Sequence, residues 1–383
     1  MNEEELKHLN KLIKTNERFA IWRMPNEATL CFVHQQNPEA YCCERIEQLN
    51  NVKGFVVAPF SPSKEHPIVV IRSECGIQQT ALASNTDKEN HPTYKKQADS
   101  KNNNIPKCNA AYHMPQTSTN ENATLDMEYR TNFSIFSKAL QAEQLQKLVL
   151  SRSKEKALSA DFSPAHAFIE AVYRYPYSYV YLCHTPETGT WMGSTPETLL
   201  SGKGKHWHTV SLAATLPNSK EGENTWDAHH KLEQQLVTDY IQTQLLSFGA
   251  THIHVEDPFT VQAAQLLHLR SNFHFELPNT RQIGSLLQHL HPTPAVSGLP
   301  KAEAFSFILQ HETAKRAYYA GFIGSLDPDE QTAIYVNLRC MQIREKRATL
   351  YAGGGLLSSS VLETEWNETE YKMKTMESLI PLL

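Results

Sequence analysis

Three strand-like segments follow one another in the middle of the chain, and they restrict the possible fold more than any other feature. They are SYVYLCHTP at 178–186, TWMGSTPETLLSG at 190–202 and HWHTVSLAATLP at 206–217, with only turns between them. A second series, AGFIGSLD, TAIYVNLRCM and ATLYAGGG, begins at Ala320. Strands that are neighbours in the sequence favour large antiparallel sheets over a series of βαβ units.

Helical patterns stand in blocks between these strand groups. The strongest extends from Thr225 to Gly249, where Leu232, Leu236 and Tyr240 form an apolar stripe and the glycine suits a helix end. Further helices are predicted at 134–145, at 164–175, from Pro300 toward Tyr319 and at the C-terminus. The predicted fold class is therefore α+β, with large antiparallel sheets packed together and helices on the outside.

The first part of the chain also has mixed α/β character, because a short helix precedes RFAIWRM, TLCFVHQ, GFVVAPF and PIVVIRS. Residues 84–126 are then polar, rich in asparagine and without periodicity, which predicts a flexible insert. We therefore expect one domain over residues 1–383. It would comprise an N-terminal part (1–83), the insert, and a core (127–383) that carries the chemistry.

Charge and composition exclude several classes of partner. The net charge of −5, without a long basic run, argues against binding to nucleic acid or an anionic membrane. No apolar run approaches the roughly 20 residues that span a bilayer. The N-terminal MNEEELKHLNKLIK lacks an apolar signal core, so we expect a cytoplasmic protein. The 7 cysteines include no CxxC motif, and we expect them to be reduced thiols.

Two residues are candidates for acid–base chemistry if the fold buries them. Lys147 opens the strand KLVLS, where a lysine usually extends to water, but burial would lower its pKa and make it a base. Glu197 lies in GSTPETLLSG, where a carboxylate is usually exposed, but a cleft would raise its pKa and make it a general acid. The same tripeptide PET recurs at Glu187, so the tripeptide alone indicates nothing.

Acidic residues on two predicted helices are candidates for a metal site. Glu233 lies at the edge of the apolar stripe of its helix, and Glu365, Glu368 and Lys372 share one stripe of ETEWNETEYKMK. Glu233 and Glu368 could together hold Mg²⁺. The alternative is a pair of unrelated surface acids, with Glu368 and Lys372 forming an exposed ion pair.

Arg339 and a run of glycines are candidates for an anion site. Arg339 ends the strand YVNLR, and glycines 353–355 follow the strand ATLY. An arginine beside accessible backbone N–H groups suits a carboxylate, although a β-bulge and a surface arginine are equally compatible with the pattern. SGKGK at 201–205 lacks the spacing of a phosphate loop and is predicted to be a hairpin turn.

Taken together, these segments resemble the chorismate-utilising enzymes. KLVLSR, GSTPETLL, SLAATLP, EQQLVTDYI, HPTPAVSGLP, RAYYAGFIG and YAGGG…EWNETEYK occur in the family's order over residues 130–380, and KGFVVAPF at 53–60 fits its N-terminal half. The family includes isochorismate, salicylate, anthranilate and aminodeoxychorismate synthases. The string of motifs is specific, although each motif alone is weak.

The resemblance implies a Mg²⁺-dependent isochorismate synthase that acts on chorismate. Lys147 would be the base for a water that attacks C2, and Glu197 would protonate the departing C4 hydroxyl. Glu233 and Glu368 would bind the magnesium ion, and Glu365 stays undecided between a neighbour of the metal and a bystander. The resemblance also implies substrate-binding roles for Ala214, Thr215, His291, Arg339, Gly353 and Lys372.

Two features favour the isochorismate branch within the family, namely Lys147 and the segment LHPTPAVSG at 290–298. The product would feed menaquinone or siderophore biosynthesis. The resemblance also leads us to expect a monomeric enzyme that needs no glutaminase subunit. Salicylate synthase, which also eliminates pyruvate, shares much of the pattern and is the alternative enzyme. Ala214 stands in LAAT where the family has LAGT, which leaves a non-catalytic chorismate-binding relative as a third reading.

Overall fold

Two large antiparallel sheets make up the fold of the computed structural model, which describes residues 1–72, 76–82, 126–217, 226–263 and 266–381. The insert expected at 84–126 lies outside the described residues, except for Asp126. Every strand pair in the described ranges is antiparallel. The predicted α+β class with antiparallel sheets is confirmed.

Sheet A carries the strand order β15-β7-β19-β18-β9-β8-β1-β2-β6. In that order its strands are Gly298–Leu299, Lys147–Ala157, Arg347–Leu356, Cys340–Arg344, Gly189–Thr195, Tyr179–Thr185, Arg18–Arg23, Thr29–Gln35 and Gln78–Ala81. Its first strands therefore come from the middle and end of the chain, and its last strands come from the N-terminal part.

Sheet B carries the order β12-β14-β11-β10-β17-β16-β4-β5-β3, with β13 also paired to β14. In that order its strands are Thr251–Val255, Leu266–Glu276, His206–Pro217, Thr198–Lys203, Thr332–Val336, Phe322–Leu326, Gly54–Ala58, Ile68–Ile71 and Tyr41–Cys43, and β13 is Phe259–Ala263. Both sheets thus combine strands of the N-terminal part with strands of the core.

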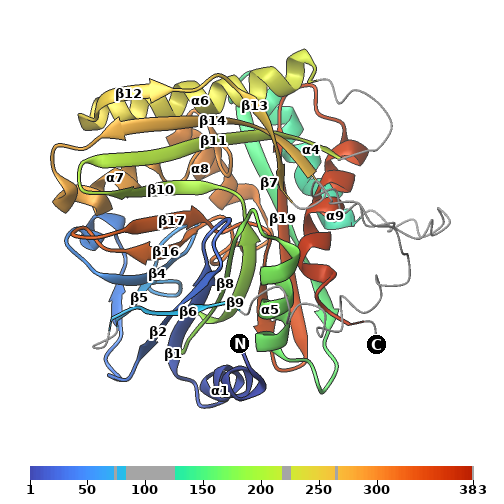
Figure 1. Ribbon diagram of the computed structural model, residues 1–383. Coiled ribbons are helices and arrows are strands. Elements are labelled where there is room, and N and C mark those ends of the chain that lie inside the picture. The colour runs from blue at the N-terminus through green and yellow to red at the C-terminus, as the bar shows by residue number, and fades with distance from the viewer. Residues whose placement is uncertain (73–75, 83–125, 218–225, 264–265, 382–383) are drawn as a thin grey trace, which may run out of the picture.

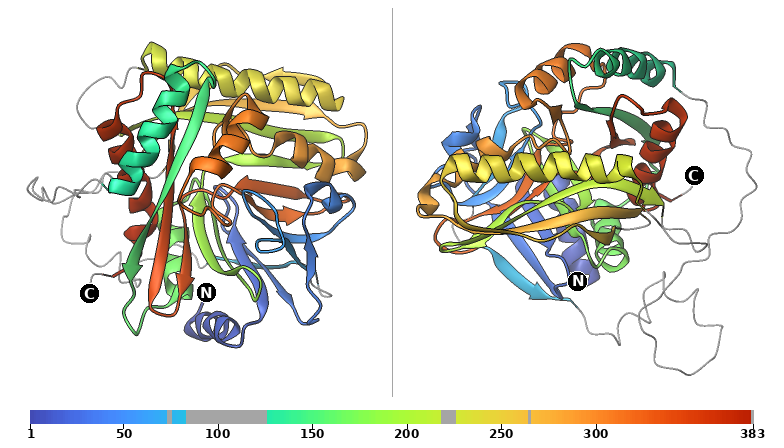
Figure 2. Two further views of the ribbon diagram at one scale, coloured as in Figure 1. Left: turned by 180° about the vertical axis from the view of Figure 1, so that it is seen from behind. Right: turned by 90° about the horizontal axis from the view of Figure 1, so that it is seen from above.

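Helices cover the outer faces of the sheets (Figure 1). They are α1 (Glu3–Lys14), α4 (Met127–Gln141), α5 (Pro164–Arg174), α6 (Ala228–Phe248), α7 (Ile283–Leu290), α8 (Lys301–His311) and α9 (Leu362–Glu377). Figure 2 shows α6 lying along the outside of sheet B, where it contacts β11 and β14. The helices α4 and α9 pack beside β7 and β19 of sheet A. No helix of the described residues has the length and apolarity to cross a membrane.

The local structure corrects three details of the helix predictions. The helix predicted from Pro300 toward Tyr319 ends at His311, and Pro300 is its N-cap. The helix predicted at 134–145 starts earlier and ends at Gln141. In α6 the predicted stripe is displaced, because Leu232 is 53% exposed. The buried positions of α6 are Gln234, Val237, Thr238, Ile241 and Leu245.

Two turn predictions hold in the structure. Gly249 ends α6 in the left-handed conformation, with φ of 91°, as expected for a C-terminal glycine. SGKGK contains the end of β10 and the turn into the antiparallel strand β11, and in that turn Gly204 has φ of 56°. The five cysteines of the described part of the chain are free thiols.

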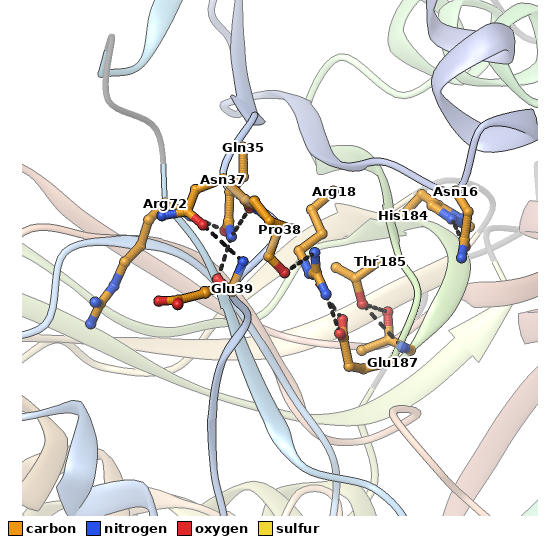
Figure 3. A network of polar contacts seen from close by, with 11 residues as sticks. Asn16, Arg18, Gln35, Asn37, Pro38, Glu39, Arg72, His184, Thr185 and Glu187 are labelled. Carbon is orange, nitrogen blue, oxygen red and sulfur yellow. Dashed lines mark hydrogen bonds and ion pairs between the residues drawn. The ribbon is translucent and has the colours of Figure 1, made fainter.

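A polar network fastens strand β1 to the β8–β9 hairpin, far along the sequence (Figure 3). The guanidinium of Arg18 forms an ion pair with Glu187 in the hairpin turn. At the end of β8, the ring of His184 binds the side-chain oxygen of Asn16 at 2.9 Å. Glu187 is therefore engaged in joining the two parts of the chain.

Candidate active site

Lys147, the first residue of β7, is fully buried and forms an ion pair with Glu233 of α6. The Lys147 side chain has 0% exposure, and its Nζ donates to Oε1 of Glu233 at 2.9 Å. Burial alone raises the pKa of Glu233, but the positive charges of Lys147 and Lys372 outweigh it, so that the pKa is lowered. The lysine therefore points into the protein rather than to water, as its catalytic role would require.

Glu197 is buried where β9 passes into β10, and its carboxyl titrates near neutral pH. Burial raises its pKa from 4.5 to about 7, against the opposing effects of Lys147, Lys372, the Thr293 hydroxyl and Arg339. A carboxyl that titrates near pH 7 can donate a proton under physiological conditions. The neighbours that act on Glu197 include three of the other predicted site residues, so the fold brings these groups together.

Three carboxylates from two helices gather over the glycines of β19. A Cβ placed on Gly355 would lie 2.4 Å from Oε1 of Glu233, and one on Gly354 would lie 3.1 Å from Oε2 of Glu365 and 3.7 Å from Oε1 of Glu368. The glycines thus allow the side chains of α6 and α9 to lie against the strand. Burial and the negative charge of Glu368 hold the pKa of Glu365 well above its usual value.

Lys372 joins this group from the next turn of α9. Its Nζ donates to the carbonyl of Gly353 at 2.8 Å and to Oε1 of Glu368 at 2.5 Å. The pair Glu368–Lys372 is only 22% and 14% exposed at its two side chains. The pair is therefore largely buried, and it is not the exposed ion pair that the sequence alone left as the alternative.

The carboxylates of Glu233, Glu365 and Glu368 are chemically suitable ligands for a hard divalent cation, since carboxylate oxygens are the ligands that Mg²⁺ prefers. Burial, and after it the negative charges of Glu368 and Glu233, raise the pKa of Glu365, as expected where carboxylates lie close together. Within the described residues, no three acidic, histidine or cysteine side chains are already grouped to hold a metal ion. Glu233 and Glu368 are instead paired with lysines, which a cation would have to displace.

Arg339 lies at the end of a chain of contacts that reaches β11. Its Nη2 donates to Nε2 of His268 at 3.0 Å, so the proton of the imidazole is on Nδ1, which donates to the carbonyl of Ala214 at 3.0 Å. Burial and the charge of Arg339 hold the pKa of His268 well below its usual value. In the described part of the chain, Nη1 of Arg339 is buried without a hydrogen-bond partner. An anionic ligand would satisfy it.

Ala214 occupies a strained position in this chain of contacts. Its φ is 58°, and the register of β11 against β14 shifts between Ala213 and Thr215, which marks a β-bulge. Left-handed backbone favours glycine, which is the residue that the resemblance leads one to expect there. Thr215 follows the bulge and lies 3.3 Å from Nδ1 of His268.

His291 is the predicted site residue whose ring the structure does not bring to the other groups. Its Nε2 binds the carbonyl of Phe60 at 3.1 Å, and burial lowers its pKa to about 3. Thr293, two residues on, lies beside Glu197 instead. Sequence reasoning missed both Thr293 and His268; the first stood in the quoted HPTPAVSG, whereas His268 lies in a run of apolar residues that gave no signal.

Similarity to known proteins was found at the levels of sequence and structure. Isochorismate synthase EntC of Escherichia coli strain K12 is 27% identical over 248 residues, which are 62% of this chain and 63% of EntC. The salicylate biosynthesis isochorismate synthase of Pseudomonas aeruginosa is 29% identical over 61% of this chain and 50% of its own length. The aligned region thus spans less than two thirds of these relatives.

The fold is shared with solved structures. MenF, the menaquinone-specific isochorismate synthase from Escherichia coli, superposes with a TM-score of 0.72 at 20% identity, over 97% of this chain and 91% of MenF. The sequence model of the family described as chorismate binding enzyme matches residues 62–381, which include every predicted site residue. The chain therefore belongs to the chorismate-binding enzyme family.

Proposed function

We propose that this protein is a Mg²⁺-dependent isochorismate synthase, which interconverts chorismate and isochorismate. The observation that carries the proposal is the burial of Lys147 close to Glu197, whose pKa is about 7. A displacement of one ring hydroxyl by water needs a base that has lost its proton and an acid that has kept one. The names of the relatives EntC and MenF support the same reaction.

The residues divide the reaction between them. Lys147, in its neutral form, takes a proton from a water whose oxygen forms a bond to C2 of the ring. Both ring double bonds shift, from C1=C2 to C1=C6 and from C5=C6 to C4=C5, the C4–O bond breaks, and the proton of Glu197 goes to the departing hydroxyl, which leaves as water. The reverse reaction restores chorismate. Burial raises the pKa of Glu197 and so favours its protonated form.

The remaining groups would bind and orient the two carboxylates of chorismate. The unpaired Nη1 of Arg339 supports binding of the enolpyruvyl carboxylate there, together with the amide of Gly353. Glu233 and Glu368 would hold the magnesium ion, beside Lys372, with Glu365 next to them. When bound, the ion supplies positive charge for the ring carboxylate. Ala214 and Thr215 would contact substrate from the bulge of β11, and His291 would act by packing its loop.

Product analysis tests the proposal. Pure protein is incubated with chorismate and Mg²⁺, and the products are separated. Isochorismate alone is the expected result. Salicylate and pyruvate would instead identify a salicylate synthase, the second candidate that the shared motifs favour. Saturable chorismate binding without turnover would leave a non-catalytic relative, which the strained Ala214 motivates.

The names of the relatives include both menaquinone-specific and siderophore-related synthases, so we propose that the product feeds one of these two pathways. We further propose that the protein is cytoplasmic, because buried free thiols such as Cys183 and Cys340 suit a reducing compartment. We also propose that it is a monomer. Light scattering would test the monomer: a mass of 43.5 kDa is expected, and a multiple of it would refute the assignment.

A further inference from the structure

Within the described residues, the edge of sheet A beside the predicted base is paired with a further strand over only two residues of β7. On one side β7 pairs with β19 from Leu148 to Ala157, whereas on the other β15 pairs only with Lys147 and Leu148. Beyond them the amide of Val149 still donates to Ser297, at 2.7 Å. The next backbone groups, the carbonyl of Val149 and the amide of Ser151, are buried and need partners.

A buried ion pair supplies these partners. Nη2 of Arg316 donates to the carbonyl of Val149 at 2.8 Å, and Oε1 of Glu312 accepts from the amide of Ser151 at 2.7 Å. Nε of Arg316 donates to Oε2 of Glu312 at 2.6 Å, and the two side chains are only 4% and 2% exposed. The pair therefore takes the place of a neighbouring strand along this short stretch of β7.

The same arginine also reaches the loop that approaches the predicted acid. Its Nη1 donates to the carbonyl of Val296 at 2.7 Å, and its guanidinium lies 4.2 Å from the centre of the Phe60 ring. Val296 belongs to the segment that carries Thr293, the neighbour of Glu197. One guanidinium is thus bonded both to the strand that begins at Lys147 and to the loop of Thr293.

We propose that Arg316 and Glu312 are positioning residues, which fix the strand of Lys147 and the loop of Thr293 relative to each other. The proposal rests on the proposed function, because it assigns the pair an effect on the turnover of chorismate. No hydrogen bond or ion pair joins Arg316 or Glu312 to the side chain of Lys147 or Glu197, so the influence of the pair acts through the backbone of β7 and of the loop. Misplacement by about 1 Å can lower a rate by roughly 100-fold.

The test compares Arg316→Lys, Arg316→Met and Glu312→Gln with a matched control. Glu170 and Arg174 of α5 form an ion pair with the same spacing, at side chains 28% and 25% exposed, so Arg174→Met serves as the control. We expect kcat to fall by more than about 30-fold in Arg316→Met and less in Arg316→Lys, with KM within about threefold of wild type. The control should keep its kcat.

Each variant is measured at a temperature where circular dichroism shows it to be folded. Equal losses in Arg316→Met and the control, or a change in KM with unchanged kcat, would overturn the proposal. Should Arg316→Met not fold, Glu312→Gln decides by the same criterion, because its amide keeps an acceptor for Ser151 but loses the charge that holds the guanidinium of Arg316. Amide hydrogen exchange at Ser151 is a readout without turnover: exchange must accelerate in Glu312→Ala, and unchanged protection would refute the contact even if chorismate is not the substrate.

Discussion

Replacing Glu197 with glutamine should stabilise the protein at alkaline pH while it removes the proposed catalytic acid. The carboxyl is buried, and its pKa in the folded protein is about 7, compared with an ordinary value of 4.5. The folded state therefore binds this proton more tightly than the unfolded state does. In consequence, the free energy of unfolding decreases as the pH rises from the unfolded pKa through the folded pKa.

The size of this effect follows from the difference of about 2.5 pH units between the two pKa values. At about 1.36 kcal/mol per unit, ionised Glu197 costs roughly 3 kcal/mol in total, of which about 2.5 kcal/mol accrues between pH 5 and pH 8. A glutamine has nearly the same shape and does not titrate. Relative to wild type, the variant should thus gain about 2.5 kcal/mol between these two pH values.

Urea unfolding at the two pH values, without Mg²⁺ or chorismate, measures the effect. The quantity compared is the change in unfolding free energy from wild type to Glu197→Gln at each pH, so that all other titrating groups cancel. A pH-independent difference would refute the raised pKa. In the wild type, kcat should fall above about pH 7 as Glu197 ionises, and in the variant turnover should be lost while chorismate binding, followed by calorimetry, is kept.

Three further substitutions test separate parts of the site. Lys147→Met should lower kcat by more than about 1,000-fold with chorismate binding retained, and full activity in the variant would exclude the lysine as base. Glu368→Gln should raise the Mg²⁺ concentration needed for half-maximal activity by at least about 10-fold, whereas an unchanged Mg²⁺ titration would remove Glu368 from the metal site. Ala214→Gly should raise the unfolding free energy by roughly 0.5–1 kcal/mol, because glycine relieves the left-handed backbone; a loss of stability in urea would show that no strain is stored there.

The sequence predicts those parts of the fold that depend on local chemistry. Short turns between successive strands indicated antiparallel sheets. The end of α6 at Gly249 and the turn in SGKGK were predicted at the correct positions, because left-handed backbone strongly favours glycine. The buried face of α6 was misplaced for a physical reason. Polar side chains face the sheet there, since Gln234 donates to the hydroxyl of Ser211 at 2.9 Å, while Leu232 faces solvent.

The site required the fold, because its pairs join residues that lie far apart in the sequence. Lys147 and Glu233 are 86 positions apart, and no local pattern announces their ion pair. His268 could not be predicted as a site residue, because it lies among leucines in a buried stretch of β14. Only its contacts with Ala214 and Arg339 connect it to the site. The resemblance to the family implied the roles of these residues, and the fold showed which of them lie next to one another.

The charges of the ligand-free site explain why a metal and a dicarboxylate would suit it together. Lys147 and Lys372 neutralise Glu233 and Glu368, and the raised pKa of Glu365 favours its uncharged form. A dicarboxylate alone would add two negative charges beside these acids, and a divalent cation alone would have to displace lysines from their partners. Arriving together they add no net charge, so each lowers the electrostatic cost of the other. For the proposed ligands, the pairing of acids with lysines therefore favours joint binding over the binding of either ligand alone.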